Sequence, residues 1–195
     1  MTDALWYLGR ATGVVSLVLL SLVVGLGIAT RSGRPLPGLP RFAVTALHRS
    51  ASLLAVVLLA VHVVTLLFDP YAQLSLLALV VPFTAQAQPF WYGLGAVALD
   101  LVAALVVTSL LRNRLGPRVW RGVHWAAYAA WPVAVVHGLG SGTDAATAWM
   151  LTLTGVCVAA VLTAVGWRVS ERFAEVPEPA PVAPAPVPRI GAGVR

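Results

Sequence analysis

The chain alternates between long apolar runs and short segments rich in polar residues, glycine or proline. Five apolar runs reach roughly 20 residues or more, the length that an α-helix needs to cross the hydrocarbon core of a bilayer. They cover residues 5–29, 42–68, 92–111, 120–138 and 148–169. The pattern therefore predicts an all-α integral membrane protein, a five-span helical bundle within residues 1–172.

Two further segments do not fit a membrane span. Residues 74–83 are apolar but only about half the length needed, and they follow a helix break at Pro70. We expect them to form a short interfacial or re-entrant piece at the outer face. Residues 173–195 alternate proline with small residues, a composition typical of an extended, disordered tail.

Composition agrees with the membrane class and narrows the choice of partners. Of the 195 residues, 59% are hydrophobic and only 10% are charged, whereas soluble domains carry about 25% charged residues. The formal charge of +6 comes from arginines in short loops, and no separate polar domain offers a surface for nucleic acid. We therefore expect the lipid bilayer, and not nucleic acid, as a partner. The single cysteine, Cys157, excludes an internal disulfide and is expected to be a small core residue.

The arginines are distributed unevenly between the two ends of the predicted spans. Most lie in residues 30–41, in residues 112–121 and in the flank that follows residue 169. The opposite ends carry three acidic residues: Asp3, Asp69 and Asp144. By the positive-inside rule, this pattern predicts a multi-pass plasma-membrane protein with its N-terminus outside and its C-terminal tail in the cytoplasm.

All four histidines lie inside predicted spans, His48 and His62 in the second and His124 and His137 in the fourth. An imidazole within a membrane span is costly and needs a partner. His48 and His62 are 14 residues apart, which places them within about 40° of the same helix face and about 21 Å apart along the axis. Because the second and fourth spans run in the same direction, we expect His48 to lie level with His124 near the cytoplasmic face. His62 is then level with His137 near the outer face.

Two histidine pairs at two depths predict two b-type haems. Haem iron accepts axial imidazoles, and helical bundles build such sites from side chains on facing helices. We expect an inner haem held by His48 and His124 and an outer haem held by His62 and His137, both between the second and fourth spans. Since two axial histidines leave no open coordination position, these haems would carry electrons across the membrane, and no catalytic residue is predicted.

The histidine spacing in the fourth span is awkward for such an arrangement. His124 and His137 are 13 residues apart, which places them about 140° apart around an ideal helix. Pro132 lies between them, and we expect a proline kink with local tightening to bring the two side chains toward one face.

Four arginines are candidates for binding haem propionates through charge-assisted hydrogen bonds. Arg49, Arg118 and Arg121 are expected at the inner histidine pair, where the alternative is that they only set the topology. Arg10 lies inside the first span, where it either binds a propionate or extends to the lipid headgroups.

The third span contains one acidic residue, Asp100, and an acid within the membrane is a candidate functional residue. Asp100 would relay protons, pair with Arg10, or form a hydrogen bond with a neighbouring helix. Together with the histidines it leaves a second function open, that of a transporter or of a proton or metal relay. Against metal transport, the histidines of each span are roughly 20 Å apart along the helix, whereas a metal site needs ligands within one coordination shell.

These residues resemble the ferric-reductase-like transmembrane domain family. Ferric reductases, NADPH oxidases and the haem subunit of the bacterial methionine sulfoxide reductase system share this domain. The resemblance rests on the 14- and 13-residue histidine spacings and on the motif Trp120-Arg121-x-x-His124, and it covers about residues 5–169. Residues 8–13 (LGRATG) and 137–144 (HGLGSGTD) are similar to the actinobacterial members. The resemblance implies that the four histidines ligate two haem b groups and that electrons pass from the cytoplasmic to the outer side.

The C-terminal end differs from that of the larger relatives. Ferric reductases and NADPH oxidases continue into FAD- and NAD(P)H-binding domains, whereas residues 173–195 hold no glycine-rich phosphate loop and are too few for such a fold. The resemblance therefore implies a stand-alone oxidoreductase subunit that takes electrons from a separate flavoprotein, from a membrane quinol or from a soluble partner that the tail recruits. It does not select an acceptor, and iron as a substrate does not follow from it.

Overall fold

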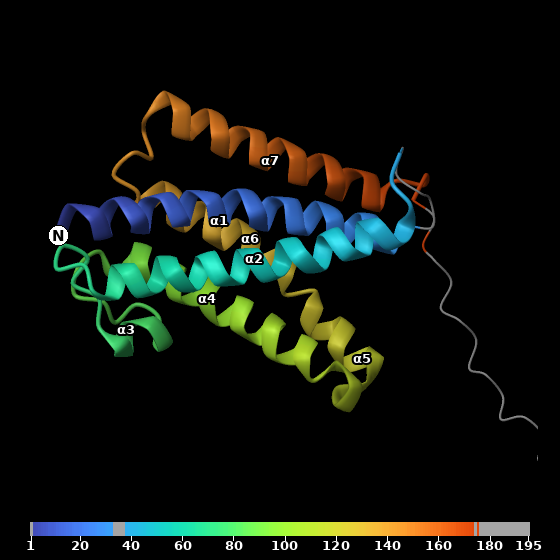
Figure 1. Cartoon of the computed structure of the whole chain (residues 1–195), viewed down its shortest axis with the longest axis horizontal. Coiled ribbons are helices and arrows are strands. Elements are labelled where there is room, and N and C mark those ends of the chain that lie inside the picture. Colours follow the sequence, from blue (N-terminus) through green and yellow to red (C-terminus); the bar gives the residue numbers. More distant parts are fainter. Residues whose placement is uncertain (1, 33–37, 174, 176–195) are drawn as a thin grey trace, which may run out of the picture.

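The structure is a computed structural model that describes residues 2–32, 38–173 and 175. This part of the chain is helical and contains no β-strand (Figure 1). The helices are α1 (Thr2–Arg31), α2 (Arg41–Leu67), α3 (Leu76–Val80), α4 (Pro89–Leu110), α5 (Arg112–His124), α6 (Ala127–Ser141) and α7 (Ala148–Val169). The all-α prediction is confirmed. Most of the predicted disordered tail, residues 176–195, lies outside the described residues.

Four of the helices are long and apolar enough to cross a membrane. They are Ala4–Arg31, Arg41–Leu67, Pro89–Leu110 and Ala148–Val169, and they correspond to the predicted first, second, third and fifth spans. Many of their large apolar side chains face outward, for example Leu53, Leu54 and Val57 of α2, which are 60%, 50% and 58% exposed. Outward apolar side chains are expected where a helix contacts lipid. The chain is therefore a multi-pass membrane protein.

The predicted fourth span, residues 120–138, is not one continuous helix. Helix α5 ends at His124, a turn follows at Trp125 and Ala126, and α6 begins at Ala127. Around this turn the backbone N–H groups of Ala126, Tyr128 and Ala129 each donate to the carbonyl three residues earlier. In a regular α-helix the acceptor is the carbonyl four residues earlier. With 15 residues, α6 is about 22 Å long, shorter than the hydrocarbon core.

The segment expected to be a basic loop, residues 112–121, belongs instead to helix α5. The helix is interrupted at Gly116, whose φ of 75° and ψ of 160° are not helical. The following residue is Pro117, and a proline disfavours the helical conformation of the residue before it. Because glycine has no Cβ, it adopts this positive φ at little cost. The prediction of a loop was wrong because hydropathy does not register a short, strongly basic helix.

Helix α1 is the centre of the packing. It packs most extensively against α2 and also contacts α7 and α6, while α4 packs against α6, α5 and α3. Figure 1 shows α1 between α7 and α2. Among the described residues, α2 makes no extensive contact with α5 or α6. Of the histidine-bearing helices, α2 thus packs mainly against α1, whereas α5 and α6 pack mainly against α4.

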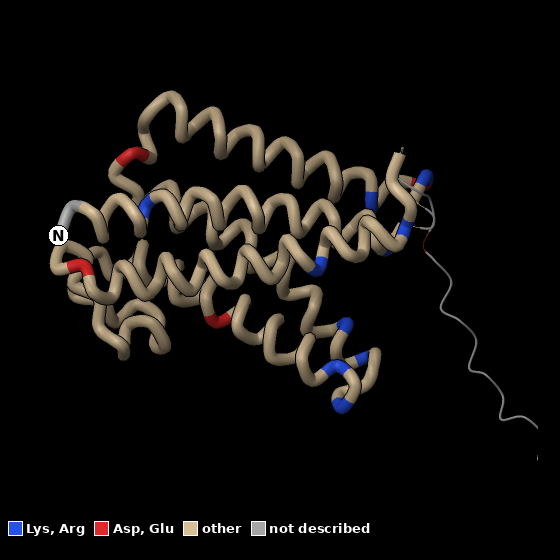
Figure 2. The backbone as a smooth tube through the Cα atoms, in the orientation of Figure 1, with Lys and Arg blue, Asp and Glu red and all other residues tan. Residues whose placement is uncertain are grey.

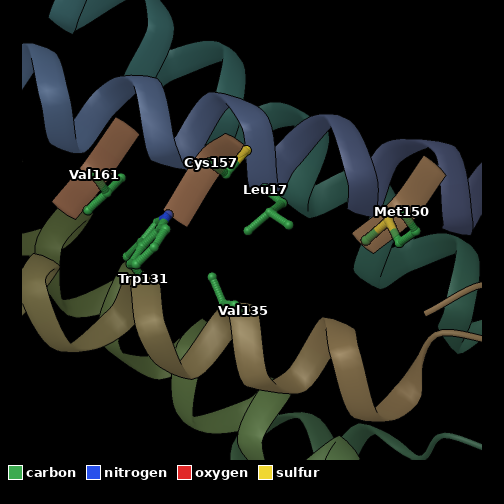
Figure 3. Close-up of a cluster of buried hydrophobic side chains, with 6 residues drawn as sticks. All are labelled: Leu17, Trp131, Val135, Met150, Cys157 and Val161. Carbon is green, nitrogen blue, oxygen red and sulfur yellow. The ribbon is translucent and has the colours of Figure 1, made fainter. Parts of the chain in front are cut away.

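The buried core joins α1, α6 and α7 (Figure 3). It consists of Leu17, Trp131, Val135, Met150, Cys157 and Val161. The Trp131 ring N–H donates a 2.8 Å hydrogen bond to the Ser21 hydroxyl, which in turn donates to the Leu17 carbonyl. Cys157 is a free, buried thiol in this core, as expected of a small core residue.

Basic and acidic residues are distributed unevenly along the bundle (Figure 2). The basic positions gather mainly at the end where α5 and the C-terminal end of α7 lie. At that end Arg31 donates hydrogen bonds of 2.6 and 3.2 Å to the Glu175 carboxylate, and these bonds hold the pKa of that carboxyl below its usual value. Acidic Asp69 and Asp144 follow the C-terminal ends of α2 and α6. The uneven charge distribution inferred from the sequence is present in the folded chain.

Candidate functional site

The two histidines of α2 lie against the backbone of α1. His62 Nδ1 is 2.7 Å from the Gly9 carbonyl oxygen, and His48 Nδ1 is 3.2 Å from the Val23 carbonyl oxygen. A carbonyl oxygen can only accept a hydrogen bond, so Nδ1 is the protonated nitrogen in both rings. When such a ring is neutral, its Nε2 atom keeps the lone pair.

Glycines make these contacts possible. A Cβ built on Gly13 would lie 2.8 Å from His62 Cε1 and 2.9 Å from its Nδ1, closer than real Cβ atoms approach. A Cβ on Gly27 would lie 3.3 Å from His48 Cε1. Small residues in a helix let a neighbouring helix approach closely. This holds for Gly13 and Gly27, whereas a Cβ on Gly25 would meet nothing within 4 Å.

His137 of α6 has the same environment on a different helix. Its Nδ1 is 2.8 Å from the Trp91 carbonyl oxygen of α4, and a Cβ on Gly95 would lie 2.7 Å from its Cε1 and 2.9 Å from its Nδ1. The Nδ1 atom is again the donor, and Nε2 makes no hydrogen bond within the described part of the chain. Sequence reasoning missed Gly95. The available signal was a glycine in the span that neighbours the histidine helix.

His124 differs from the other three histidines. It is the last residue of α5, and its ring packs against Trp120 with the ring centroids 4.9 Å apart. Its Nδ1 is buried and has no hydrogen-bond partner among the described residues. A buried ring nitrogen without a partner is costly, and among the described residues this ring lacks the backbone hydrogen bond that orients the other three.

The electrostatic interactions between the four half-buried rings divide them into two groups. His48 interacts with His124, and His62 interacts with His137. Each group joins α2 to the α5–α6 segment, so the helices bring together residues more than 70 positions apart in the sequence.

The helix break explains how one segment supplies rings to both groups. A residue in a three-residue turn rotates about 120° instead of about 100°. The three short-range bonds at residues 126, 128 and 129 therefore remove about 60° of the 140° mismatch expected for an ideal helix. Local tightening was expected, but the change of direction falls at residues 125–126. Pro132, the residue expected to cause it, lies inside α6.

Arg10 and Asp100, proposed as a possible pair, do not pair with each other. Arg10 forms an ion pair with Asp144, and its guanidinium also lies 4.0 Å from the centroid of the Trp6 ring. Asp100 is exposed near the middle of α4. The hypothesis of an Arg10–Asp100 pair is therefore wrong.

The other candidate arginines lie close in the sequence to His48 or to His124. Arg49 follows His48 on α2 and is exposed, and Arg118 and Arg121 precede His124 on α5. Arg118 is exposed and Arg121 is half-buried. Their location is compatible with binding an anionic group at this end of the bundle.

Comparison with known protein families identifies the fold. The family model described as the ferric reductase like transmembrane component matches residues 12–135. The chain belongs to this family. The matched part of this ferric-reductase-like chain runs from α1 into α6 and includes His48, His62 and His124, with His137 two residues beyond it. No curated protein and no solved structure matches the chain.

Family membership indicates a membrane electron-transfer protein of a kind that generally binds haem, and the residues present fit that cofactor. Iron ligation needs a neutral imidazole with a free nitrogen lone pair. The contacts of His48, His62 and His137 place the proton of a neutral ring on Nδ1, which leaves this lone pair on Nε2. Within the described residues, no three His, Cys, Asp or Glu side chains form a metal cluster. Pairs of histidines suit a cofactor that takes one protein ligand on each side.

Proposed function

We propose that this chain is a di-haem b membrane cytochrome that moves electrons from the cytoplasmic side to an acceptor at the outer side. His48 and His124 ligate the inner haem, and His62 and His137 ligate the outer haem. One observation carries the proposal: three histidines, His48, His62 and His137, place Nδ1 against a backbone carbonyl of a neighbouring helix, which leaves Nε2 available. The pairing of His48 with His124 and of His62 with His137 is part of the proposal, and the electrostatic interaction within each pair supports it.

In this proposal the protein orients the histidine ligands and shields them from water. Haem b, when bound, supplies an iron that takes up and releases one electron. The backbone carbonyls of Gly9, Val23 and Trp91 fix three rings and their tautomer. The apolar helices around them exclude water. His48 and His62 of α2 are about 21 Å apart along the helix axis, so they would hold two haems at two different depths of the bilayer.

The proposed topology has five spans, with α6 as the fourth. Although α6 is short, α5 continues the path of the chain toward the basic end, and α6 packs against the spanning helix α4. The charge asymmetry supports a cytoplasmic location for the basic end and for the C-terminal tail, and an outer location for the N-terminus. His48 and His124 then face the cytoplasmic leaflet.

The arginines near the inner pair are proposed propionate ligands. Arg49, Arg118 and Arg121 lie beside His48 or on the helix of His124, and guanidinium groups form strong paired hydrogen bonds with carboxylates. Arg10 would act in the same way at the outer haem only by sharing its guanidinium with Asp144.

The electron donor is proposed to be a separate flavoprotein or a membrane quinol, with the tail as a possible docking segment for a soluble partner. A transporter or proton or metal relay is the alternative function. The grouping of the histidines supports it less, because each group offers two nitrogens, whereas zinc sites use three or four protein ligands. Asp100, the remaining acid of the spans, is exposed on α4.

The test is a dithionite-reduced minus oxidised visible spectrum of the purified chain, with haem counted per chain. We expect low-spin b-type bands and two haems. His124→Ala and His137→Ala should each remove one haem and leave the other, and Thr163→Ala, an exposed position on α7, should remove none. Absence of haem from protein made with ample haem supply would overturn the proposal, and proton-flux and zinc-binding assays would then test the alternative.

A further inference from the structure

We propose that Gly13, Gly27 and Gly95 are positioning residues for the haem ligands. Each glycine exposes the backbone carbonyl four residues before it to the Nδ1–H group of one histidine. We call such a carbonyl and glycine together a carbonyl–glycine seat. The inference rests on the proposed di-haem function and assigns a role to residues that bind neither haem nor substrate.

The same arrangement occurs three times on two helices. The seats are Gly9 with Gly13 for His62, Val23 with Gly27 for His48, and Trp91 with Gly95 for His137. In an α-helix the carbonyl of one residue accepts the N–H of the residue four positions later. Each carbonyl therefore already accepts from its own glycine N–H and has a second lone pair for the imidazole. At Gly9 the Thr12 hydroxyl also lies within hydrogen-bond distance of this oxygen, at 3.1 Å.

The glycine is needed because a side chain four residues after the carbonyl stands beside its oxygen. An added Cβ would lie 2.8 Å from the ring at Gly13 and 2.7 Å at Gly95, so the ring would have to move. At Gly27 the nearest ring atom would be 3.3 Å away and Nδ1 3.7 Å away. This seat is looser, in keeping with its longer hydrogen bond of 3.2 Å.

The seats divide unequally between the two haems. Both ligands of the outer haem, His62 and His137, sit in tight seats with hydrogen bonds of 2.7 and 2.8 Å. The inner haem has one ligand in the loose seat, His48, and one with no seat, His124, whose Nδ1 has no hydrogen-bond partner in the described part of the chain. The seats therefore predict that the outer haem has the more tightly oriented axial ligands.

Small residues at a helix interface also allow simple close packing. A packing role and a role in orienting the histidines predict that different pairs of glycine variants behave alike. If the glycines only pack helices, Gly13→Ala and Gly27→Ala should resemble each other, because both change the α1–α2 interface. If they seat ligands, Gly13→Ala on α1 and Gly95→Ala on α4 should perturb the same haem. Gly27→Ala should perturb the other haem.

The experiment uses the full chain loaded with haem. For each variant we would measure haem per chain, the electron paramagnetic resonance spectrum of the oxidised protein and a reductive titration resolved into two components. The g values of low-spin ferric haem depend on the orientation of the two imidazole planes, so they report ring position directly. Gly13→Ala and Gly95→Ala should shift or remove one component, and Gly27→Ala should shift the other by a smaller amount.

Two matched controls separate seating from general disruption. A Cβ on Gly93 would collide with the Phe83 ring, so Gly93→Ala perturbs packing on α4 two residues from Gly95 without touching a histidine. Gly25→Ala lies on α1 between the two seats and meets nothing within 4 Å. Both controls should leave both haem signals unchanged. If Gly95→Ala fails to fold, the milder Gly27→Ala still tests the proposal, because only the inner signal should move.

The outcomes distinguish this proposal from the function on which it rests. If the unmodified chain binds no haem, the proposed function fails and the seats fail with it. If the unmodified chain binds two haems but Gly13→Ala and Gly95→Ala act on different components, only the seats are overturned. A Gly93→Ala effect equal to that of Gly95→Ala would likewise overturn them.

Discussion

A neutral imidazole inside an apolar bundle has one nitrogen that donates and one that accepts. Burying the donor without a partner costs about 1–3 kcal/mol, and His48, His62 and His137 avoid this cost by donating to a backbone carbonyl. The carbonyls are already bonded within their own helices, so the protein satisfies the rings without adding a polar side chain to the membrane interior. Under the proposed function, the acceptor nitrogen is the one that ligates haem iron.

The ion pair between Arg10 and Asp144 gives the first prediction. The two side chains are 26% and 33% exposed, so the pair is only partly screened and its loss should cost about 1 kcal/mol. Arg10→Gln and Asp144→Asn should each lower the temperature at which helical circular dichroism is lost, and the double variant should be no less stable than the worse single variant.

The haem spectrum serves as the control for this pair. Both single variants should retain two haems with unchanged titration components, because Asp144 already neutralises Arg10. A shifted haem component in Arg10→Gln that is absent from Asp144→Asn would show that Arg10 acts on a propionate, as the sequence also allowed.

At the scale of the elements, hydropathy predicted the long helices well and the short ones poorly. The four helices of spanning length follow from apolar runs, because only a helix satisfies its own backbone in lipid. The break at residues 125–126 depends on three backbone hydrogen bonds that span three residues instead of four. They occur in a stretch that remains apolar throughout. No change in side-chain character marks it, so the sequence pattern indicated one continuous helix.

The candidate site was likewise predicted only in part from the sequence. The histidines were found because imidazole is rare and costly in a membrane span. The Gly95 seat and the Arg10–Asp144 pair were missed because each joins elements far apart in the chain, and a periodic pattern within one helix contains no information on its neighbours. The sequence analysis considered Asp100 as a partner of Arg10 because both residues lie in predicted spans. The partner in the structure is Asp144, in the loop after α6.

Helix α5 gives a prediction at this scale. Gly116 has a φ of 75° and a ψ of 160°, a conformation essentially restricted to glycine that costs other residues about 1–3 kcal/mol. Gly116→Ala should therefore destabilise α5 and, since His124 is its last residue, lower the occupancy of the inner haem before the outer one. Haem content measured during gentle heating would detect this loss.

The matched control lies in the same helix. Gly122 has helical geometry, and a Cβ there would meet nothing within 4 Å, so Gly122→Ala should be neutral or stabilising by up to about 1 kcal/mol. Equal losses of the inner haem in both variants would contradict a role for the Gly116 backbone.

At the scale of the whole molecule, the unequal ligand environments predict unequal haems. A hydrogen bond from Nδ1–H to an acceptor makes the imidazole a stronger electron donor to its metal, which stabilises the ferric state and lowers the reduction potential. Both proposed outer ligands have short bonds of this kind, whereas among the described residues the inner pair has one longer bond, at His48, and none at His124 Nδ1. The outer haem should therefore have the lower potential of the two.

Such an order opposes electron flow from the inner to the outer haem, and the membrane itself offsets it. Moving one negative charge outward across an inside-negative membrane is favoured by about 2.3 kcal/mol per 100 mV when the full potential is crossed. Redox titration of the purified chain should resolve two components, with His137→Ala removing the lower one and His124→Ala the higher one. The reverse assignment would mean that propionate charges or solvent exposure outweigh the axial ligands, and Arg49, Arg118 and Arg121 would then be the residues to vary.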